Sequence, residues 1–204
     1  MIRNLIFDFG QVIIRFEPDY MVAPYVSSPE DAALLAPILF DRLYWERLDE
    51  GTISDEETLA AVRARLPERL WEAAEKAYWN WIYNIPEIEG MTELVQRVKE
   101  KYGVGVYLLS NISQYFVSHR AEIPALAHFD GCVFSSDLQL IKPDARIFDH
   151  VCRKFDLDPS ETLFIDDNQA NIAGARAFGL QGYVFDGRAD ALAAYLDTVL
   201  TTEK

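Results

Sequence analysis

Short apolar runs recur along the chain, and each one stops at a polar residue or a glycine. Such runs predict buried strands of a parallel sheet, because strands covered on both faces read as continuous stretches of hydrophobic residues. The predicted strands cover residues 5–7, 104–109, 132–134, 162–165 and 183–185. Amphipathic stretches of helical period lie between them, at residues 91–102, 114–121, 145–155 and 171–178. Strands that alternate with helices predict an α/β fold with a Rossmann-like parallel sheet.

The alternation is interrupted between residues 16 and 87, where helix signals replace strand signals. Ser54 and Glu57 have the spacing of a capping box, in which a serine and a glutamate satisfy the first amides of a helix. Pro67 is suited to the first turn of a second helix, which we expect to stop before Pro86.

This interruption predicts two domains. Residues 1–15 and 88–204 would form the α/β core, and residues 16–87 would form a helical cap inserted after the first strand. A last amphipathic helix, at residues 189–200, is expected to pack on the core.

Polar residues gather where the predicted strands end. In a parallel sheet these ends share one edge, which is where open α/β folds bind ligands. The sequence therefore predicts that residues distant along the chain meet at this edge. They are Asp8, the pair Ser110 and Asn111, residues 135–137, Lys142, and the group Asp166, Asp167 and Asn168.

The residue types at this edge fit phosphate chemistry. Asp8, Asp166 and Asp167 offer carboxylate oxygens, the ligands that Mg²⁺ prefers. Like charges this close need a cation, which Lys142 would supply together with the metal.

Ser110 and Asn111 offer a hydroxyl, an amide and nearby backbone N–H groups that can hold phosphoryl oxygens. An aspartate such as Asp8 can then act as the nucleophile and form an aspartyl-phosphate.

The overall charge is strongly acidic, with 33 acidic and 19 basic residues and a formal net charge of −14. Such a field repels nucleic acid and anionic membrane surfaces, so neither is an expected partner. Two cysteines that form no close-spaced motif, and the lack of a signal peptide or a long apolar run, favour a cytoplasmic location. The expected partner is a small phosphorylated metabolite, and the expected assembly is a monomer or a weak homodimer.

Four short motifs surround the polar residues at the sheet edge. They read Phe7-Asp8-Phe9-Gly10-Gln11-Val12, Leu109-Ser110-Asn111, Lys142-Pro143-Asp144-Ala145-Arg146-Ile147-Phe148 and Phe164-Ile165-Asp166-Asp167-Asn168. With these motifs in this order, the chain resembles the haloacid dehalogenase superfamily, and the insert resembles that superfamily's C1 cap. The chain is similar in particular to the bacterial α-D-glucose-1-phosphatase type, through residues 8–13, 51–56 and 142–148.

The resemblance implies a magnesium-dependent phosphatase of small phosphate monoesters, with sugar phosphates such as glucose 1-phosphate among the substrates. Asp8 would be both nucleophile and metal ligand, and Lys142 would bridge it to the phosphate. Ser110 and Asn111 would bind phosphate. Asp167 and the Gly10 backbone carbonyl would bind the metal, and Asp166 would support it from outside or through water. Asn171 would contact the site.

One position departs from the superfamily's pattern. Most of its phosphatases carry a second aspartate two residues after the nucleophile, as general acid and base, and here that position is Gly10. The glucose-1-phosphatase type also has glycine there. We expect either a preference for good leaving groups or a proton supplied by a cap residue or by a water that Gln11 holds.

Three other functions remain open at this point. A 2-haloacid dehalogenase would use Asp8 without a metal, although the pair Asp166 and Asp167 argues against it. A phosphosugar mutase would need the acid/base aspartate that Gly10 replaces. Loss of that aspartate is also what a non-catalytic phosphate-binding or scaffold protein would show. In the insert, the group Trp71, Tyr78, Trp79, Trp81 and Tyr83 is interpreted as cap core, and one residue among Tyr44, Trp45, Glu46 and Arg47 is a candidate to face the site.

Overall fold

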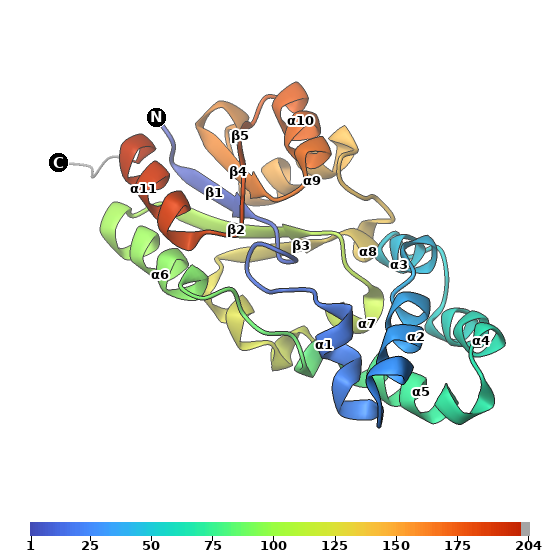
Figure 1. Cartoon of the computed structure of the whole chain (residues 1–204). Helices are drawn as coiled ribbons and strands as arrows, with labels where there is room; N and C mark the ends of the chain where they lie inside the picture. The colour runs from blue at the N-terminus through green and yellow to red at the C-terminus, as the bar shows by residue number, and fades with distance from the viewer. Residues whose placement is uncertain (201–204) are drawn as a thin grey trace.

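The computed structural model describes residues 1–200 and contains a five-stranded parallel sheet (Figure 1). The strand order is β3-β2-β1-β4-β5, which places β1 at the centre. The predicted strands are confirmed, with their ends displaced by no more than a few residues. They are β1 (Asn4–Phe7), β2 (Gly105–Ser110), β3 (Gly131–Phe134), β4 (Thr162–Asp166) and β5 (Gln181–Val184).

The side chains of the central strands alternate between two buried faces. On β1, Leu5 and Phe7 join one hydrophobic cluster and Ile6 joins the other. On β4, Leu163 belongs to the first cluster and Phe164 to the second. This alternation follows from the pleat of a strand, and it explains why the sequence shows continuous apolar runs.

Two pairs of helices cover the two faces. On one face α6 (Met91–Tyr102) packs beside α11 (Ala189–Val199), and on the other α9 (Ala145–Phe155) packs beside α10 (Gln169–Phe178) (Figure 1). The packing of the last helix on the core is thereby confirmed. Gly103 caps α6 in the left-handed region with a φ of 64°, a conformation that glycine adopts without steric cost.

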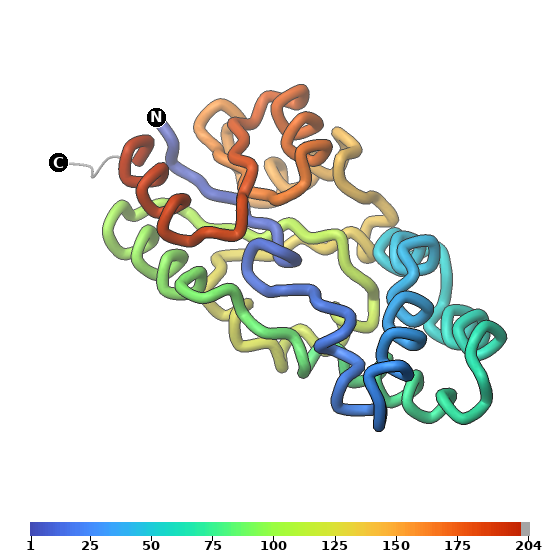
Figure 2. The backbone as a smooth tube through the Cα atoms, viewed as in Figure 1, coloured from blue at the N-terminus to red at the C-terminus, as the bar shows by residue number. Residues whose placement is uncertain are grey.

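The insert after β1 folds as helices that lie together at one end of the molecule (Figure 2). The capping box is present, since Ser54 Oγ accepts from the Glu57 amide and the Glu57 carboxylate accepts from Ser54. The expectation for Pro67 is wrong: it precedes a short 3-10 turn, and the α-helix begins only at Trp71. The α-helices are α1 (Pro18–Val22), α2 (Pro29–Leu39), α3 (Arg42–Asp49), α4 (Asp55–Arg65) and α5 (Trp71–Asn80). The 3-10 helices of the insert are η1 (Ala23–Tyr25), η2 (Glu68–Leu70) and η3 (Trp81–Tyr83).

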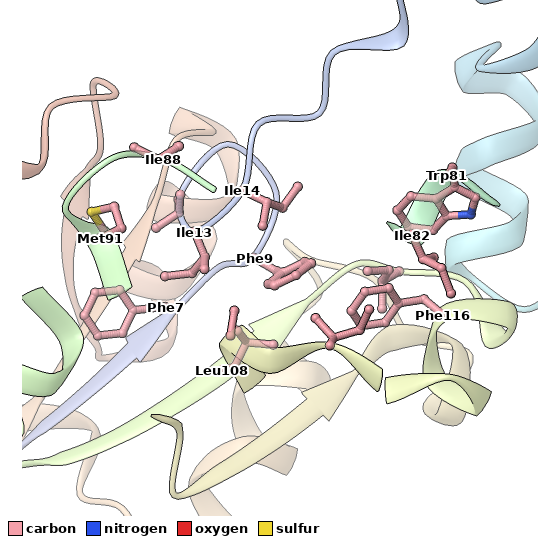
Figure 3. Close-up of a cluster of buried hydrophobic side chains, with 14 of the residues drawn as sticks. Phe7, Phe9, Ile13, Ile14, Trp81, Ile82, Ile88, Met91, Leu108 and Phe116 are labelled. Carbon is pink, nitrogen blue, oxygen red and sulfur yellow. The ribbon is translucent and has the colours of Figure 1, made fainter. Parts of the chain in front are cut away.

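The hydrophobic core continues from the sheet into these helices. Trp81 of η3 stacks on Phe116, with the ring centroids 5.9 Å apart, and Phe116 in turn contacts Phe9 at 5.1 Å (Figure 3). Phe116 lies in α7 (Gln114–Ser118), which is shorter than predicted because the chain turns into a separate 3-10 helix. The division into core and cap domains stays a prediction.

Smaller elements complete the chain. Residues 135–137, expected as a strand end, form the start of the short helix α8 (Ser135–Leu138). Within residues 1–200, no helix is both long and apolar enough to cross a membrane. The remaining 3-10 helices are η4 (Arg120–Glu122), η5 (Pro124–His128) and η6 (Pro159–Glu161).

Candidate active site

A buried lysine joins two aspartates at the carboxyl edge of the sheet. Lys142 Nζ lies 2.7 Å from Asp8 Oδ1 and 2.8 Å from Asp166 Oδ2, and it also donates to the Leu109 carbonyl at 3.1 Å. The Lys142 and Asp166 side chains are fully buried, and that of Asp8 is 12% exposed. A cation held this far from water is stable only because the two carboxylates offset its desolvation.

The loop that carries Lys142 is fixed by two contacts. The Asn111 side chain forms a reciprocal pair with the Lys142 backbone, accepting from its N–H at 2.8 Å and donating to its carbonyl at 3.2 Å. Gly174 of α10 lets the loop approach closely, since a Cβ there would lie 2.6 Å from Pro143 Cβ and 2.8 Å from its carbonyl oxygen. The structure thus gives the Asn111 side chain a positioning contact, and its predicted phosphate binding stays a prediction.

Asp166 is held on every side. Its carboxylate accepts from the Asn168 amide at 2.8 Å and from Asn171 Nδ2, with both oxygens at 3.1 Å, in addition to Lys142. The predicted contact of Asn171 with the site is therefore confirmed. Asp167, by contrast, is exposed, so the two neighbouring aspartates have different surroundings.

The carboxylates of Asp8, Asp166 and Asp167 can together hold a metal ion. Each offers one oxygen, and the three oxygens lie within 4.8 Å of one another. An all-oxygen donor set of this kind fits a hard divalent cation such as Mg²⁺. The saturated hydrogen bonding of Asp166 leaves Asp8 and Asp167 as the freer ligands.

The charges of the aspartates and of Lys142 shift one another's pKa values. Burial raises the pKa of Asp8 above its ordinary value, and the neighbouring Asp166 raises it further, whereas Lys142 opposes both. Burial lowers the pKa of Lys142, but the two carboxylates outweigh burial, so the pKa is raised and the lysine stays charged. Burial and the charge of Asp166 also raise the pKa of Asp167.

Two buried serines follow neighbouring strands, with Ser110 ending β2 and Ser135 directly after β3. Ser110 is buried at the end of β2, and within residues 1–200 its hydroxyl makes only a long contact of 3.4 Å, to the Asn111 carbonyl. Ser135 Oγ accepts from the Ile112 amide at 2.9 Å and donates to the backbone carbonyl of Asp49 in the insert. One serine therefore ties the loop after β2 to helix α3.

A cavity of about 280 Å³ opens between the sheet edge and the insert. Its walls are mostly aromatic and aliphatic, and its polar groups are few. From the group Tyr44 to Arg47, the structure brings Trp45 and Glu46 to this cavity. The lining residues are Phe9, Gly10, Ile14, Phe16, Phe40, Arg42, Trp45, Glu46, Asp49, Trp81, Ser110, Asn111 and Ile112.

One expectation about the insert needs correction. Of the aromatic group interpreted as cap core, Tyr78 and Trp81 are buried, but Trp71 and Tyr83 are 39% and 53% exposed, and Trp81 also lines the cavity. Gln11 lies in the turn before the insert, with a φ of 56°, and its Nε2 donates to the Phe16 carbonyl at 3.1 Å. Its suggested role in holding a water stays a prediction.

Asp49 and Gly174 were not predicted from the sequence to lie at this edge of the sheet, and Ser135 was predicted there without its contact with the insert. Ser135 stood in a noted polar group, yet its role depends on a contact with a residue 86 positions away. Asp49 is the last residue of α3, a place where a carboxylate is unfavourable because the helix dipole is negative there. That unfavourable placement is the one sequence signal that could have drawn attention to it.

A parallel sheet with acidic groups, a lysine and a cavity at its carboxyl edge defines an α/β enzyme with its active site at that edge. The model of the haloacid dehalogenase-like hydrolases matches residues 2–179, and the chain belongs to this family. The fold and the hydrolase class predicted from the sequence are thus confirmed.

Similar proteins include phosphatases and dehalogenases. The chain is 26% identical over 198 residues to the D-ribitol-5-phosphate phosphatase of Bacteroides thetaiotaomicron, covering 93% of this chain and 95% of the relative. It is 28% identical over 182 residues to the sesquiterpene phosphatase of Aspergillus oryzae, covering 88% of each chain. A crystal structure of a family enzyme from Bacteroides thetaiotaomicron, in complex with magnesium and inorganic phosphate, shares the fold with a TM-score of 0.71 at 21% identity, covering 92% of this chain and 95% of that one.

Proposed function

We propose that the protein is a phosphatase that hydrolyses small phosphate monoesters through an aspartyl-phosphate on Asp8. The observation that carries this proposal is the buried Lys142 between Asp8 and Asp166, which places one fixed positive charge beside a carboxylate nucleophile. Together with the divalent cation proposed below, that charge would offset the local carboxylates and attract a phosphate into a protein whose overall charge is −14. The two relatives named as phosphatases, each matched over most of its length, support the same reaction class.

Asp8, Lys142 and Ser110 have different roles in the proposed phosphoryl transfer. Asp8 Oδ2 is free of the hydrogen bonds that hold Oδ1, which accepts from the Phe9 amide and from Lys142, both at 2.7 Å. The free oxygen attacks phosphorus while the pair of donors keeps the carboxylate in place. Lys142 and the Ser110 hydroxyl offset the charge that gathers on the phosphoryl oxygens, which is where such reactions gain most of their rate.

For the metal we propose Mg²⁺, held by Asp8, the Gly10 backbone carbonyl and Asp167, with Asp166 supporting it from outside or through water. When bound, it supplies positive charge against the phosphoryl group. The three carboxylates at one edge fit this assignment, and they have no evident use in a metal-free reaction.

We propose sugar or polyol phosphates as the substrate class, with glucose 1-phosphate and ribitol 5-phosphate as the compounds to try first. The cavity of about 280 Å³ accommodates a small organic group, and Arg42, Glu46 and Asp49 offer partners for hydroxyls against an otherwise apolar wall. We further propose that residues 16–87 act as a C1-type cap that encloses this group.

A phosphomonoester panel tests the proposal. Inorganic phosphate release is measured with Mg²⁺ for glucose 1-phosphate, ribitol 5-phosphate, an isoprenyl phosphate and dinitrophenyl phosphate. We expect turnover of at least one ester, its abolition in Asp8→Asn, and its retention in Asp19→Asn, a change at an exposed aspartate of α1. Full activity in Asp8→Asn would refute the role of Asp8.

The same preparation tests the dehalogenase alternative. Chloride release from 2-chloropropionate in the presence of EDTA, without release of phosphate from any ester, would replace the phosphatase proposal. No turnover of any substrate by a protein that still binds Mg²⁺ would favour a binding protein.

A further inference from the structure

The position two residues after Asp8 carries no side chain, so the proton for the departing oxygen must come from elsewhere. The cavity that contains Gly10 and Ser110 also contains Asp49, the last residue of α3. Asp49 is partly buried, and its carboxylate has no hydrogen-bond or ion-pair partner within residues 1–200. An unpartnered carboxyl in a largely apolar cavity is costly for stability, which points to a function.

The backbone at Asp49 is held firmly over the site. Its carbonyl accepts from Ser135 Oγ, the same oxygen that anchors the Ile112 amide two residues after Ser110. Gly51 then turns the chain with a φ of 71°, and its position against Ser136 is so close that a Cβ would lie 3.0 Å from the Ser136 carbonyl oxygen. Gln139 Nε2 donates to the Gly51 carbonyl at 3.3 Å. The end of α3 is therefore fixed to the core by contacts at Asp49 itself and at Gly51.

The surroundings of Asp49 favour its protonated form. Burial, followed by the charge of Asp8, raises the pKa of Asp49 to about 7. Glu46 also raises this pKa, whereas Lys142 and Arg42 oppose the change. The charge of Asp8 affects the pKa of Asp49, so the two carboxyl groups interact electrostatically. A carboxyl with a pKa near neutrality can both donate and accept a proton at physiological pH.

From this geometry we propose that Asp49 is a catalytic residue, the general acid and base of the reaction, which the insert supplies in place of a side chain at Gly10. This assignment rests on the proposed phosphatase function.

The reaction consists of two half-reactions, formation and hydrolysis of the aspartyl-phosphate. Asp8 Oδ2 bonds to phosphorus, the bond between phosphorus and the ester oxygen breaks with its electron pair on that oxygen, and the protonated Asp49 gives it a proton. The products are the alcohol, the aspartyl-phosphate and the Asp49 carboxylate. That carboxylate next takes a proton from water as the water oxygen attacks phosphorus, and the bond to Asp8 breaks with its electron pair on the Asp8 carboxylate. Inorganic phosphate leaves, and both aspartates return to their starting states.

The leaving group provides the test, because dinitrophenolate departs without a proton and an alkoxide does not. We expect Asp49→Asn to lower kcat/KM for butyl phosphate by about 10²- to 10⁴-fold and to change kcat/KM for dinitrophenyl phosphate by less than about threefold. The control Glu50→Gln alters the neighbouring carboxyl, which lies outside the cavity lining, and should leave both values unchanged. An equal fall on both substrates in Asp49→Asn, or no fall on either, would overturn the assignment.

A measurement on the unmodified protein keeps the proposal testable if the variant does not fold. Across a series of aryl and alkyl phosphates, protonation of the leaving oxygen predicts a shallow dependence of kcat/KM on leaving-group pKa. A steep dependence, or turnover of dinitrophenyl phosphate alone, would show that no acid operates. Failure to hydrolyse any ester would instead contradict the phosphatase proposal itself.

Discussion

Replacing Lys142 with methionine removes the only cation at the junction of Asp8 and Asp166 among the described residues while keeping a side chain of similar length. The variant leaves two buried carboxylates facing each other. Asp166 keeps its bonds from Asn168 and Asn171, but Asp8 keeps only that from the Phe9 amide.

The expected loss follows from the burial of this charge pair. At neutral pH, removal of one partner of a buried ion pair destabilises a protein by about 3–5 kcal/mol, chiefly because the remaining charge has no compensation. Since Asp8 and Asp166 both face Lys142 within 2.8 Å and Asp166 is fully buried, we expect a loss in this range in the free energy of unfolding. The loss should shrink toward pH 4, because burial raises the pKa of Asp8, and protonation of Asp8 removes one unpaired charge from the variant and one partner of Lys142 from the wild type.

Urea denaturation followed by circular dichroism, in EDTA at pH 7 and pH 4, measures this difference. The control is Lys154→Met, which removes an exposed lysine whose Nζ donates to the Cys132 carbonyl at 3.1 Å. A surface change of this kind should alter the unfolding free energy by no more than about 0.5 kcal/mol. A loss below about 1 kcal/mol for Lys142→Met, or one equal to that of Lys154→Met, would refute the view that Lys142 carries the charge balance of the site.

Three further predictions follow from the same geometry. Asp167→Asn should raise the Mg²⁺ concentration needed for half-maximal phosphatase activity by about tenfold or more, as measured by metal titration, and an unchanged requirement would exclude Asp167 as a ligand. The fold should accommodate Gly10→Asp, because a Cβ at Gly10 meets no atom within 4 Å. Combined with Asp49→Asn, this substitution should restore alkyl-phosphate hydrolysis at least in part. A double variant as inactive as Asp49→Asn would contradict the view that a carboxyl at either position can supply the proton. The raised pKa of Asp49, about 7, means that the folded state binds more protons than the unfolded state between about pH 4 and 7, so that folding stability falls as pH rises through this window. In EDTA, Asp49→Asn should therefore be more stable than the wild type at pH 8 by about 1–2 kcal/mol, a value discounted for partial exposure, and equally stable at pH 4. Thermal denaturation measures this difference, and a lower midpoint for the variant than for the wild type at pH 8 would contradict the prediction.

The sheet and the meeting of distant residues at its edge could be predicted from the sequence because both follow from local patterns. A run such as residues 162–165 reads as a buried strand on its own, and Asp166 follows it directly. Once parallel strands are inferred, Asp8 and Asp166 must emerge at the same edge. The salt bridges through Lys142 confirm that placement.

The parts that escaped prediction depend on tertiary contacts. The contact of the Asn111 side chain with the Lys142 backbone, 31 residues away, was not predicted, whereas the phosphate binding of Asn111 stays a prediction. Asp49 lines the cavity because the end of α3 is fixed to the core, in part by Ser135, and no periodicity in the insert signals that contact. Pro67 was expected to begin an α-helix, but here it extends the chain before a 3-10 turn with a ψ of 146°.

The central claim, that Asp8 carries the phosphoryl group, can be tested directly by trapping the intermediate. The enzyme would be mixed with Mg²⁺ and a hydrolysed ester, quenched in acid, treated with borohydride to reduce any acyl phosphate, digested and analysed by mass spectrometry. We predict that the peptide containing Asp8 carries homoserine at this position, and that the modification is absent without substrate. Efficient phosphate release accompanied by an unmodified Asp8, or by reduction at another carboxylate, would contradict the account.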